Sequence, residues 1–372
     1  MSPFGAYRKV SLCVGSLMFE PRVLSDGQYR AGLDVADGEA VPKHIETGRT
    51  GPTNFWKGPH RMQLFMRALV RATIGLVILA ALFGSGYAGG WWFFACVALV
   101  TIIALWEYYS ALRVRGIRPN AKLGGLCVLL ILLIIQYSEN MRMALRQAGD
   151  VALGLQDLNV IINALHLTFL VLLFCVAGTL VCQFRMRSGE SQVANSATTV
   201  FGVVYVGLLF SFVLRMRYVD VPALTDLEQA SEFARRLGGL TFVIVPVWIA
   251  DSAAYLVGNL WGRRQVAPHI SPGKTLEGSI GGLIGAIAGA LVIGSWLGLS
   301  LMQSALLGAA MGMVGQLGDL GKSVLKRDLG IKDFGVIFGP HGGVLDRFDA
   351  ILFSMPLVYW YFWFLVMRVG VY

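Results

Sequence analysis

Charged residues are scarce in this chain: Asp, Glu, Lys and Arg together make up 14% of its 372 residues. A soluble domain carries about 25% charged residues. Apolar residues reach 56%, above the usual range of about 45–50%. Both departures indicate that lipid is the solvent for most of the chain, and they exclude an ordinary soluble domain.

Cysteine pairs at the spacing of a metal site are also missing. The five cysteines are scattered, and four of them lie in apolar runs, where a free cysteine behaves as a small hydrophobic residue. They are Cys13, Cys96, Cys127, Cys175 and Cys182. The pattern therefore indicates neither a disulfide framework nor a zinc site.

Short segments of alternating polarity, which mark a transmembrane β-barrel, do not occur. The chain contains continuous apolar runs instead, such as "ATIGLVILAALF" and "FLVLLFCVAGTLV". Because a spanning helix needs about 20 mostly apolar residues, we predict an all-α, polytopic integral membrane protein with about nine transmembrane helices. The predicted spans are 72–88, 91–109, 122–137, 160–182, 196–215, 238–258, 278–298, 301–317 and 350–367.

Basic residues set the expected orientation. The net charge of +9 reflects 31 Lys and Arg against 22 Asp and Glu. Lys and Arg gather before the first span and after the second, fourth, sixth and eighth, which predicts that the N-terminus and these loops face the cytoplasm. Such a basic excess meets anionic lipid headgroups, so nucleic acid is not an expected partner.

The first 56 residues lack a spanning run and mix Gly, Pro and charged residues. We predict a polar, mobile N-terminal extension over 1–56 and a transmembrane domain over 57–372. A translation start at Met62 is an alternative, and nothing in the sequence indicates a role for the extension.

Polar clusters occur at three predicted cytoplasmic ends of spans. In the first, "ADSAAYLVGNLWGRR", Asp251 and Tyr255 are four residues apart and share a helix face. A carboxylate at this depth is costly unless it is paired or hydrated. We interpret Asp251 as part of a cytoplasm-facing polar cavity that reaches into the membrane; the alternative is a structural bond to a neighbouring helix.

The second cluster is "HISPGKTLEGSIGG". Ser271 starts a turn, Thr275 can cap the following helix, and glycines allow that helix to pack closely. Lys274 beside the amides of a helix N-terminus is a candidate anion site. Taken alone, this stretch could equally be an ordinary loop and helix cap.

The third cluster, "GQLGDLGKSVLKRDLGIKDFGVIFGPHGGVLDRFD", concentrates both signs of charge. Its basic residues are Lys322, Lys326, Arg327 and Lys332, and its acidic residues are Asp319, Asp328, Asp333, Asp346 and Asp349. Basic groups in this number suit a polyphosphate, and carboxylates on two helices suit Mg²⁺ bridging to it. Gly342 and Gly343 predict a phosphate-binding turn before the last helix. The alternative is a solvated charged loop.

Residues 323–349 resemble the signature of the phosphatidate cytidylyltransferases, also called CDP-diacylglycerol synthases. The matching positions are Ser323, Leu325-Lys326-Arg327, Lys332-Asp333, Gly335, His341-Gly342-Gly343 and Asp346-Arg347-Phe348-Asp349. The first two clusters resemble further blocks of the family, and the similarity covers roughly residues 62–372. Gly339-Pro340 departs from the Pro-Gly that many members carry, and residues 1–56 have no counterpart.

The resemblance implies the reaction of CTP with phosphatidate to give CDP-diacylglycerol and pyrophosphate, with Mg²⁺ and a K⁺ ion as cofactors. It also implies a homodimer in the bacterial inner membrane, with the active site facing the cytoplasm.

The expected roles follow from the matched positions. We expect Asp319, Asp346 and Asp251 to bind metal; Lys326, Arg327 and Lys332 to bind phosphates; and Lys274 to neutralise pyrophosphate. Ser323, Asp333 and His341 complete the expected catalytic set, with His341 orienting substrate rather than moving a proton. Tyr255, Ser271, Thr275, Gly342, Gly343 and Arg347 are the remaining candidates for substrate binding.

Two other functions stay open. A CTP-dependent lipid kinase of the polyprenol or phytol type would transfer the γ-phosphate and release CDP. An ion-coupled transporter with Asp251 on its path would carry polar residues on both membrane sides, whereas the charges here are one-sided. The sequence leaves open the acyl or ether-lipid preference, the cation on each carboxylate, the effect of Gly339-Pro340, and regulation.

Overall fold

The structure, a computed structural model, describes residues 22–23, 29–30, 77, 80–147, 153–182, 184, 191–219, 221, 231–335 and 342–369. The chain divides into two units, Met1–Arg61 and Met62–Tyr372. In the first unit, strand β1 (Arg22–Val23) pairs antiparallel with β2 (Tyr29–Arg30). The second unit contains the helices and the candidate site.

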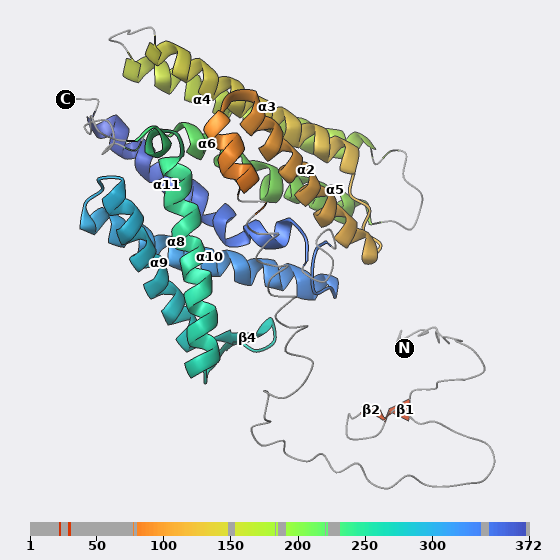
Figure 1. Cartoon of the computed structure of the whole chain (residues 1–372). Helices are drawn as coiled ribbons and strands as arrows, with labels where there is room; N and C mark the ends of the chain where they lie inside the picture. Colours follow the sequence, from red (N-terminus) through yellow and green to blue (C-terminus); the bar gives the residue numbers. More distant parts are fainter. Residues whose placement is uncertain are drawn as a thin grey trace, which may run out of the picture. The chain divides into compact units, whose positions relative to one another are not determined.

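The second unit is a helical assembly (Figure 1). Residues 80–88 are helical and lead to α2. The elements that follow are α2 (Gly90–Val114), α3 (Ala121–Gln147), α4 (Leu153–Cys182), α5 (Gln192–Gly202), the π-helix η2 (Val203–Leu208), α6 (Leu209–Tyr218), α8 (Glu232–Trp261), β3 (Gln265–Ala267), β4 (Ser271–Thr275), α9 (Leu276–Trp296), α10 (Leu301–Leu329) and α11 (Leu345–Val369).

Within the described residues, seven helical segments are long and apolar enough to cross a membrane. They are Gly90–Val114, Ala121–Leu145, Leu158–Cys182, Gln192–Tyr218, Glu232–Trp261, Leu276–Trp296 and Leu345–Leu365. The prediction of an all-α polytopic membrane protein is confirmed. The predicted span 72–88 lies partly outside the described residues, and 301–317 falls in α10, which is helical but rich in Gly. The number nine therefore stays a prediction.

Helices α8 and α9 lie side by side because α9 turns a glycine-rich face toward α8 (Figure 1). A Cβ atom added at Gly285 would lie 2.7 Å from Cβ of Ala253 and 3.1 Å from the carbonyl oxygen of Ile249. Small residues allow such close approach of helix backbones in membranes. The close packing predicted from the glycines of this segment is confirmed.

The loop between α8 and α9 forms the short antiparallel hairpin of β3 and β4. Glu277, in the first turn of α9, accepts hydrogen bonds from the backbone amides of Arg263 (3.0 Å) and Arg264 (3.2 Å). Thr275 accepts from the amide of Gly278 at 3.1 Å, which confirms its predicted role as the cap of α9. These bonds fix the hairpin to the helix that it precedes.

Helices α10 and α11 pack against each other, so the last turns of α10 lie near the first turns of α11. Helix α10 ends where Gly330 adopts a left-handed conformation, with φ of 68°. Arg115, just after α2, donates from Nε to the carbonyl oxygen of Leu329 at 3.0 Å. A hydrogen bond between residues far apart in the sequence therefore fixes the C-terminal end of α10, the helix that carries charged residues of the third cluster.

Candidate active site

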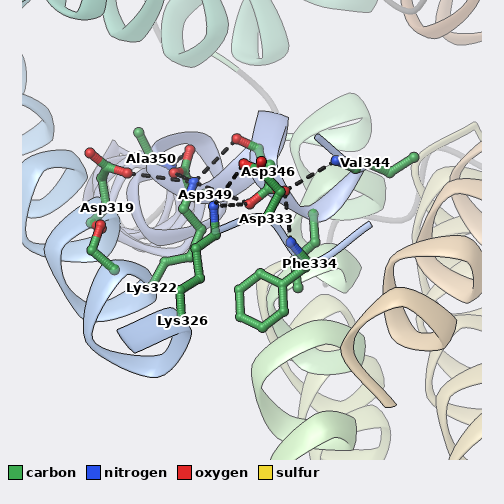
Figure 2. A network of polar contacts seen from close by, with 12 residues as sticks. Asp319, Lys322, Lys326, Asp333, Phe334, Val344, Asp346, Asp349 and Ala350 are labelled. Atoms are coloured by element: carbon green, nitrogen blue, oxygen red, sulfur yellow. Dashed lines mark hydrogen bonds and ion pairs between the residues drawn. The ribbon is translucent and has the colours of Figure 1, made fainter. Parts of the chain in front are cut away.

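Lysines of α10 meet aspartates of α11 in one cluster, whose side chains point toward one another in Figure 2. The Lys322 side chain is 6% exposed, and its ammonium contacts the carboxylate of Asp349. The same ammonium lies 3.5 Å from Oδ1 of Asp319 and 3.8 Å from Oδ1 of Asp346. A buried lysine thus lies among three carboxylates from two helices.

Lys326, one turn further along α10, approaches the same carboxylate oxygen of Asp346 more closely than Lys322 does. Its Nζ lies 2.5 Å from Oδ1 of Asp346 and 3.6 Å from Oδ1 of Asp333. It also lies 5.7 Å from the centre of the Phe334 ring. The charge of Lys326 is therefore held between a buried and a more exposed carboxylate.

Asp346 organises the segment that precedes α11. Its Oδ2 accepts from the backbone amides of Phe334 and Gly343, both at 3.1 Å. Gly342 adopts φ of +83°, a region that favours glycine. A Cβ atom there would lie 3.0 Å from Oδ2 of Asp346. Glycine at this position therefore allows the backbone to turn closely around the carboxylate.

Asp319 faces a different element. Its carboxylate forms an ion pair with Lys274 of β4, which brings the hairpin to the C-terminal half of α10. Lys322 contacts both Asp319 and Asp349, as described above. Asp251 of α8 is exposed and interacts electrostatically with both of them. The site therefore draws on α8, β4, α10 and α11.

The predicted metal ligands Asp319, Asp346 and Asp251 do not form a ready ligand set. No group of three or more His, Cys, Asp or Glu side chains within the described part of the chain is arranged to hold a metal ion. Lysine ammonium groups lie between the carboxylates instead.

Two predicted polar residues are engaged by backbone groups. Ser323 donates its hydroxyl to the carbonyl oxygen of Asp319 at 2.8 Å, one turn back in α10. Arg327 donates from Nε to the carbonyl oxygen of Ile270 at 2.9 Å, in the turn of the hairpin. Arg327 thus connects the end of α10 to the element that carries Lys274.

The remaining predicted residues lie around the cluster or outside the described residues. Lys332 and Arg347 are exposed, and Tyr255 is exposed on α8. Ser271 and Thr275 are the two ends of β4. His341 lies outside the described residues, as do Gly339 and Pro340.

The turn expected to bind phosphate donates its amides to carboxylates of the chain itself. The Gly343 amide donates to Asp346, as described above. The amides of Val344 and Leu345 donate to Oε1 and Oε2 of Glu107, each at 3.0 Å. Glu107 belongs to α2, and sequence reasoning gave it no role. A single glutamate within the apolar run "ALWEYY" was the available signal, because ionisable residues inside spans are costly and often functional.

Comparisons with known proteins identify the family of the chain. A family model described as "Cytidylyltransferase family" matches residues 69–365. A protein named phosphatidate cytidylyltransferase from Synechocystis is 30% identical over 315 residues, covering 79% of this chain and 94% of that protein. One of the same name from Staphylococcus haemolyticus is 29% identical over 294 residues, covering 78% and 96%. Another from Aquifex aeolicus is 44% identical over 120 residues, covering 32% and 45%.

The match extends over both helices that supply the lysine–aspartate cluster and over the hairpin beside them. The chain belongs to the cytidylyltransferase family.

Proposed function

We propose that this protein is a phosphatidate cytidylyltransferase, which transfers the cytidylyl group of CTP to phosphatidate and releases pyrophosphate. The names of the relatives support this substrate pair. The observation that carries the proposal is the cluster in which Lys322 and Lys326 of α10 meet Asp346 and Asp349 of α11. A site for two phosphate-bearing substrates needs such a concentration of cations at the end of the helices.

In the proposed reaction, an oxygen of the lipid phosphate attacks the α-phosphorus of CTP. The bond from that phosphorus to the bridging oxygen of the β-phosphate breaks, and pyrophosphate leaves. Two anions must approach each other, so positioning and charge neutralisation lower the barrier most. No general base is needed, because phosphatidate is already ionised.

The lysines are suited to this task. Lys274 approaches from the hairpin, and its side chain is 26% exposed, so a pyrophosphate could replace its carboxylate partner. Lys326 is 12% exposed and lies nearer the first turn of α11. We assign Lys326, with the exposed Lys332, to the phosphates of CTP or of the lipid.

We also propose that Mg²⁺ binds here. Asp319, Asp333, Asp346 and Asp349 form ion pairs with Lys274, Lys322 and Lys326, so carboxylates outnumber ammonium groups in the cluster. Mg²⁺ usually takes one or two carboxylates and completes its shell with water and substrate phosphate. The described residues offer no ready group of three metal ligands, so the proposal needs only one or two of these carboxylates, with water and substrate phosphates as the other ligands.

Asp319 and Asp346 would hold it, with Asp349 beside them and Asp251 available to a second cation. The ion supplies charge neutralisation of the triphosphate when bound. We retain K⁺ as the companion ion on the strength of the resemblance alone, without assigning it a residue.

The basic loops indicate which side of the membrane the site faces. The cluster lies at the same end of its helices as the basic residues that predict a cytoplasmic location, which supports a polar cavity open to the cytoplasm in a bacterial inner-membrane protein. A homodimer is proposed from the resemblance.

The test uses purified protein in detergent with phosphatidate, Mg²⁺ and CTP labelled separately at the α- and γ-phosphates. We expect α-label in the lipid and γ-label in released pyrophosphate. Lipid labelled from the γ-position would instead identify a CTP-dependent kinase. Absence of lipid labelling from either position would contradict phosphatidate as the acceptor.

A further inference from the structure

We infer that Glu107 is a positioning residue for the site: from within a membrane-spanning helix, it fixes the backbone that sets the direction of Asp346. This inference rests on the proposed function, because Asp346 is assigned there to metal and phosphate binding.

The contacts of Glu107 end at the residues next to Asp346. Its two carboxylate oxygens accept the amides of Val344 and Leu345, each at 3.0 Å. The residue is fully buried in α2, more than two hundred positions away in the sequence. These are the amides at the N-terminal end of α11, where a negative charge is stabilised by the helix dipole.

Two glycines of the signature segment show how closely the backbone wraps around Glu107. A Cβ atom added at Gly335 or at Gly343 would collide with the Glu107 carboxyl group. The segment on both sides of 336–341 therefore passes directly over this side chain. Any other residue at either position would displace the carboxylate or the segment.

Asp346 accepts hydrogen bonds from the same stretch of backbone as Glu107. It accepts the amides of Phe334 and Gly343, whereas Glu107 accepts the next two amides along the chain. The two carboxylates together fix three successive backbone amides. Loss of Glu107 would leave the buried backbone amides of Val344 and Leu345 without their acceptor, which destabilises the turn.

A mere helix cap would stabilise α11 without affecting the chemistry. A positioning residue instead alters the turnover, because the direction of Asp346 relative to Lys326 depends on it. Loss of groups that orient a metal ligand typically lowers affinity or activity about 10–100-fold. Kinetics and the local stability of the segment therefore separate the two roles.

The experiment compares Glu107→Gln with Glu139→Gln. Glu139 is also a buried carboxylate in a spanning helix, and it pairs with Arg142 at 2.7 Å. Glutamine at 107 retains one acceptor oxygen but turns an NH₂ group toward a backbone amide. For Glu107→Gln we expect kcat to fall about 10–100-fold, with the KM for CTP changed much less. We expect Glu139→Gln to lower the melting temperature while kcat stays near the wild-type value.

Limited trypsin digestion gives a readout that does not depend on activity. Lys332 is exposed just before the segment, and we expect cleavage after it to accelerate in Glu107→Gln but not in Glu139→Gln. Should Glu107→Gln fail to fold, hydrogen exchange in the wild-type protein tests the same contact: the amides of Val344 and Leu345 should be protected, although they lie at a helix N-terminus.

The outcomes are distinguishable from those of the labelling assay. Wild-type kcat in Glu107→Gln, or rapid exchange of both amides in the wild-type protein, would overturn the inference even if cytidylyl transfer is observed. Accelerated cleavage in a protein that transfers no label would support the fixing of the segment and refute the proposed function instead.

Discussion

Nζ of Lys326 lies 2.5 Å from Oδ1 of Asp346, and this ion pair joins the end of α10 to the first turn of α11. Both side chains are largely buried, so the pair is poorly screened by solvent. Lys326 and Asp346 lie near opposite ends of the signature segment, residues 323–349, so the ion pair brings the two ends of this segment together. The same two residues are those we assign to phosphate and metal, so the ion pair holds them in place before substrate arrives.

Replacing Asp346 by Asn should greatly lower turnover while the protein stays folded. Asparagine can still accept an amide hydrogen bond, but it removes the charge that faces Lys326 and is assigned to metal. We expect kcat to fall about 100-fold or more, measured by transfer of α-label to lipid. The control is Asp328→Asn, at an exposed position of α10. Size-exclusion chromatography checks that the variant stays folded. Retained activity in Asp346→Asn, with an unchanged elution volume, would refute the assigned role.

Apolar runs were enough to predict the membrane architecture. The lengths and hydropathies of most spans agree with the seven segments found, because a helix must satisfy its own backbone in lipid. The glycines of α9 likewise predicted its close packing, since small residues leave room for a neighbouring backbone. Local signals of this kind depend on a few adjacent residues and are readable from the sequence.

The partners of each charged side chain were not readable in the same way. The sequence suggested that Arg327 binds phosphate, which stays a prediction, but it did not indicate that Nε of Arg327 donates to the carbonyl oxygen of Ile270, 57 residues earlier in the chain. Glu107 was overlooked because its contacts lie at Val344 and Leu345, far along the chain. Such contacts depend on how the helices pack, and a single sequence carries no direct record of that packing.

Removing the charge of Lys322 should destabilise the protein more than removing it together with the charge of Asp349. Lys322→Met leaves carboxylates buried without their partner, and breaking a buried pair typically costs about 3–5 kcal/mol. We expect Asp349→Asn to be destabilising as well, and the double variant to be less so than the sum of the two.

These variants form a double-mutant cycle. Their free energies of unfolding are measured in detergent, in buffer with EDTA so that no divalent cation replaces the lysine. Contacting residues show coupling of about 0.5–3 kcal/mol. Lys122→Met, at an exposed position in the first turn of α3, serves as the control and should change stability by less than about 0.5 kcal/mol. Additive effects within error would contradict a direct pairing of Lys322 with Asp349.

Arg327→Lys separates two ways in which this residue could act. If Arg327 contributes only charge to the phosphates, lysine should preserve most of its effect. The structure instead gives its Nε a hydrogen bond to Ile270, in the hairpin that presents Lys274 to Asp319. Lysine has no group equivalent to Nε, and a hydrogen bond is worth about 1 kcal/mol, or roughly a fivefold change in an equilibrium constant. We therefore expect Arg327→Lys to raise the KM for CTP several-fold, much as we expect of Arg327→Ala, with kcat changed little.

The control is Arg263→Lys, which retains the backbone bond to Glu277 and should leave both constants near wild type. A near-normal KM in Arg327→Lys together with a large increase in Arg327→Ala would show that charge, and not the tie to the hairpin, is what Arg327 supplies.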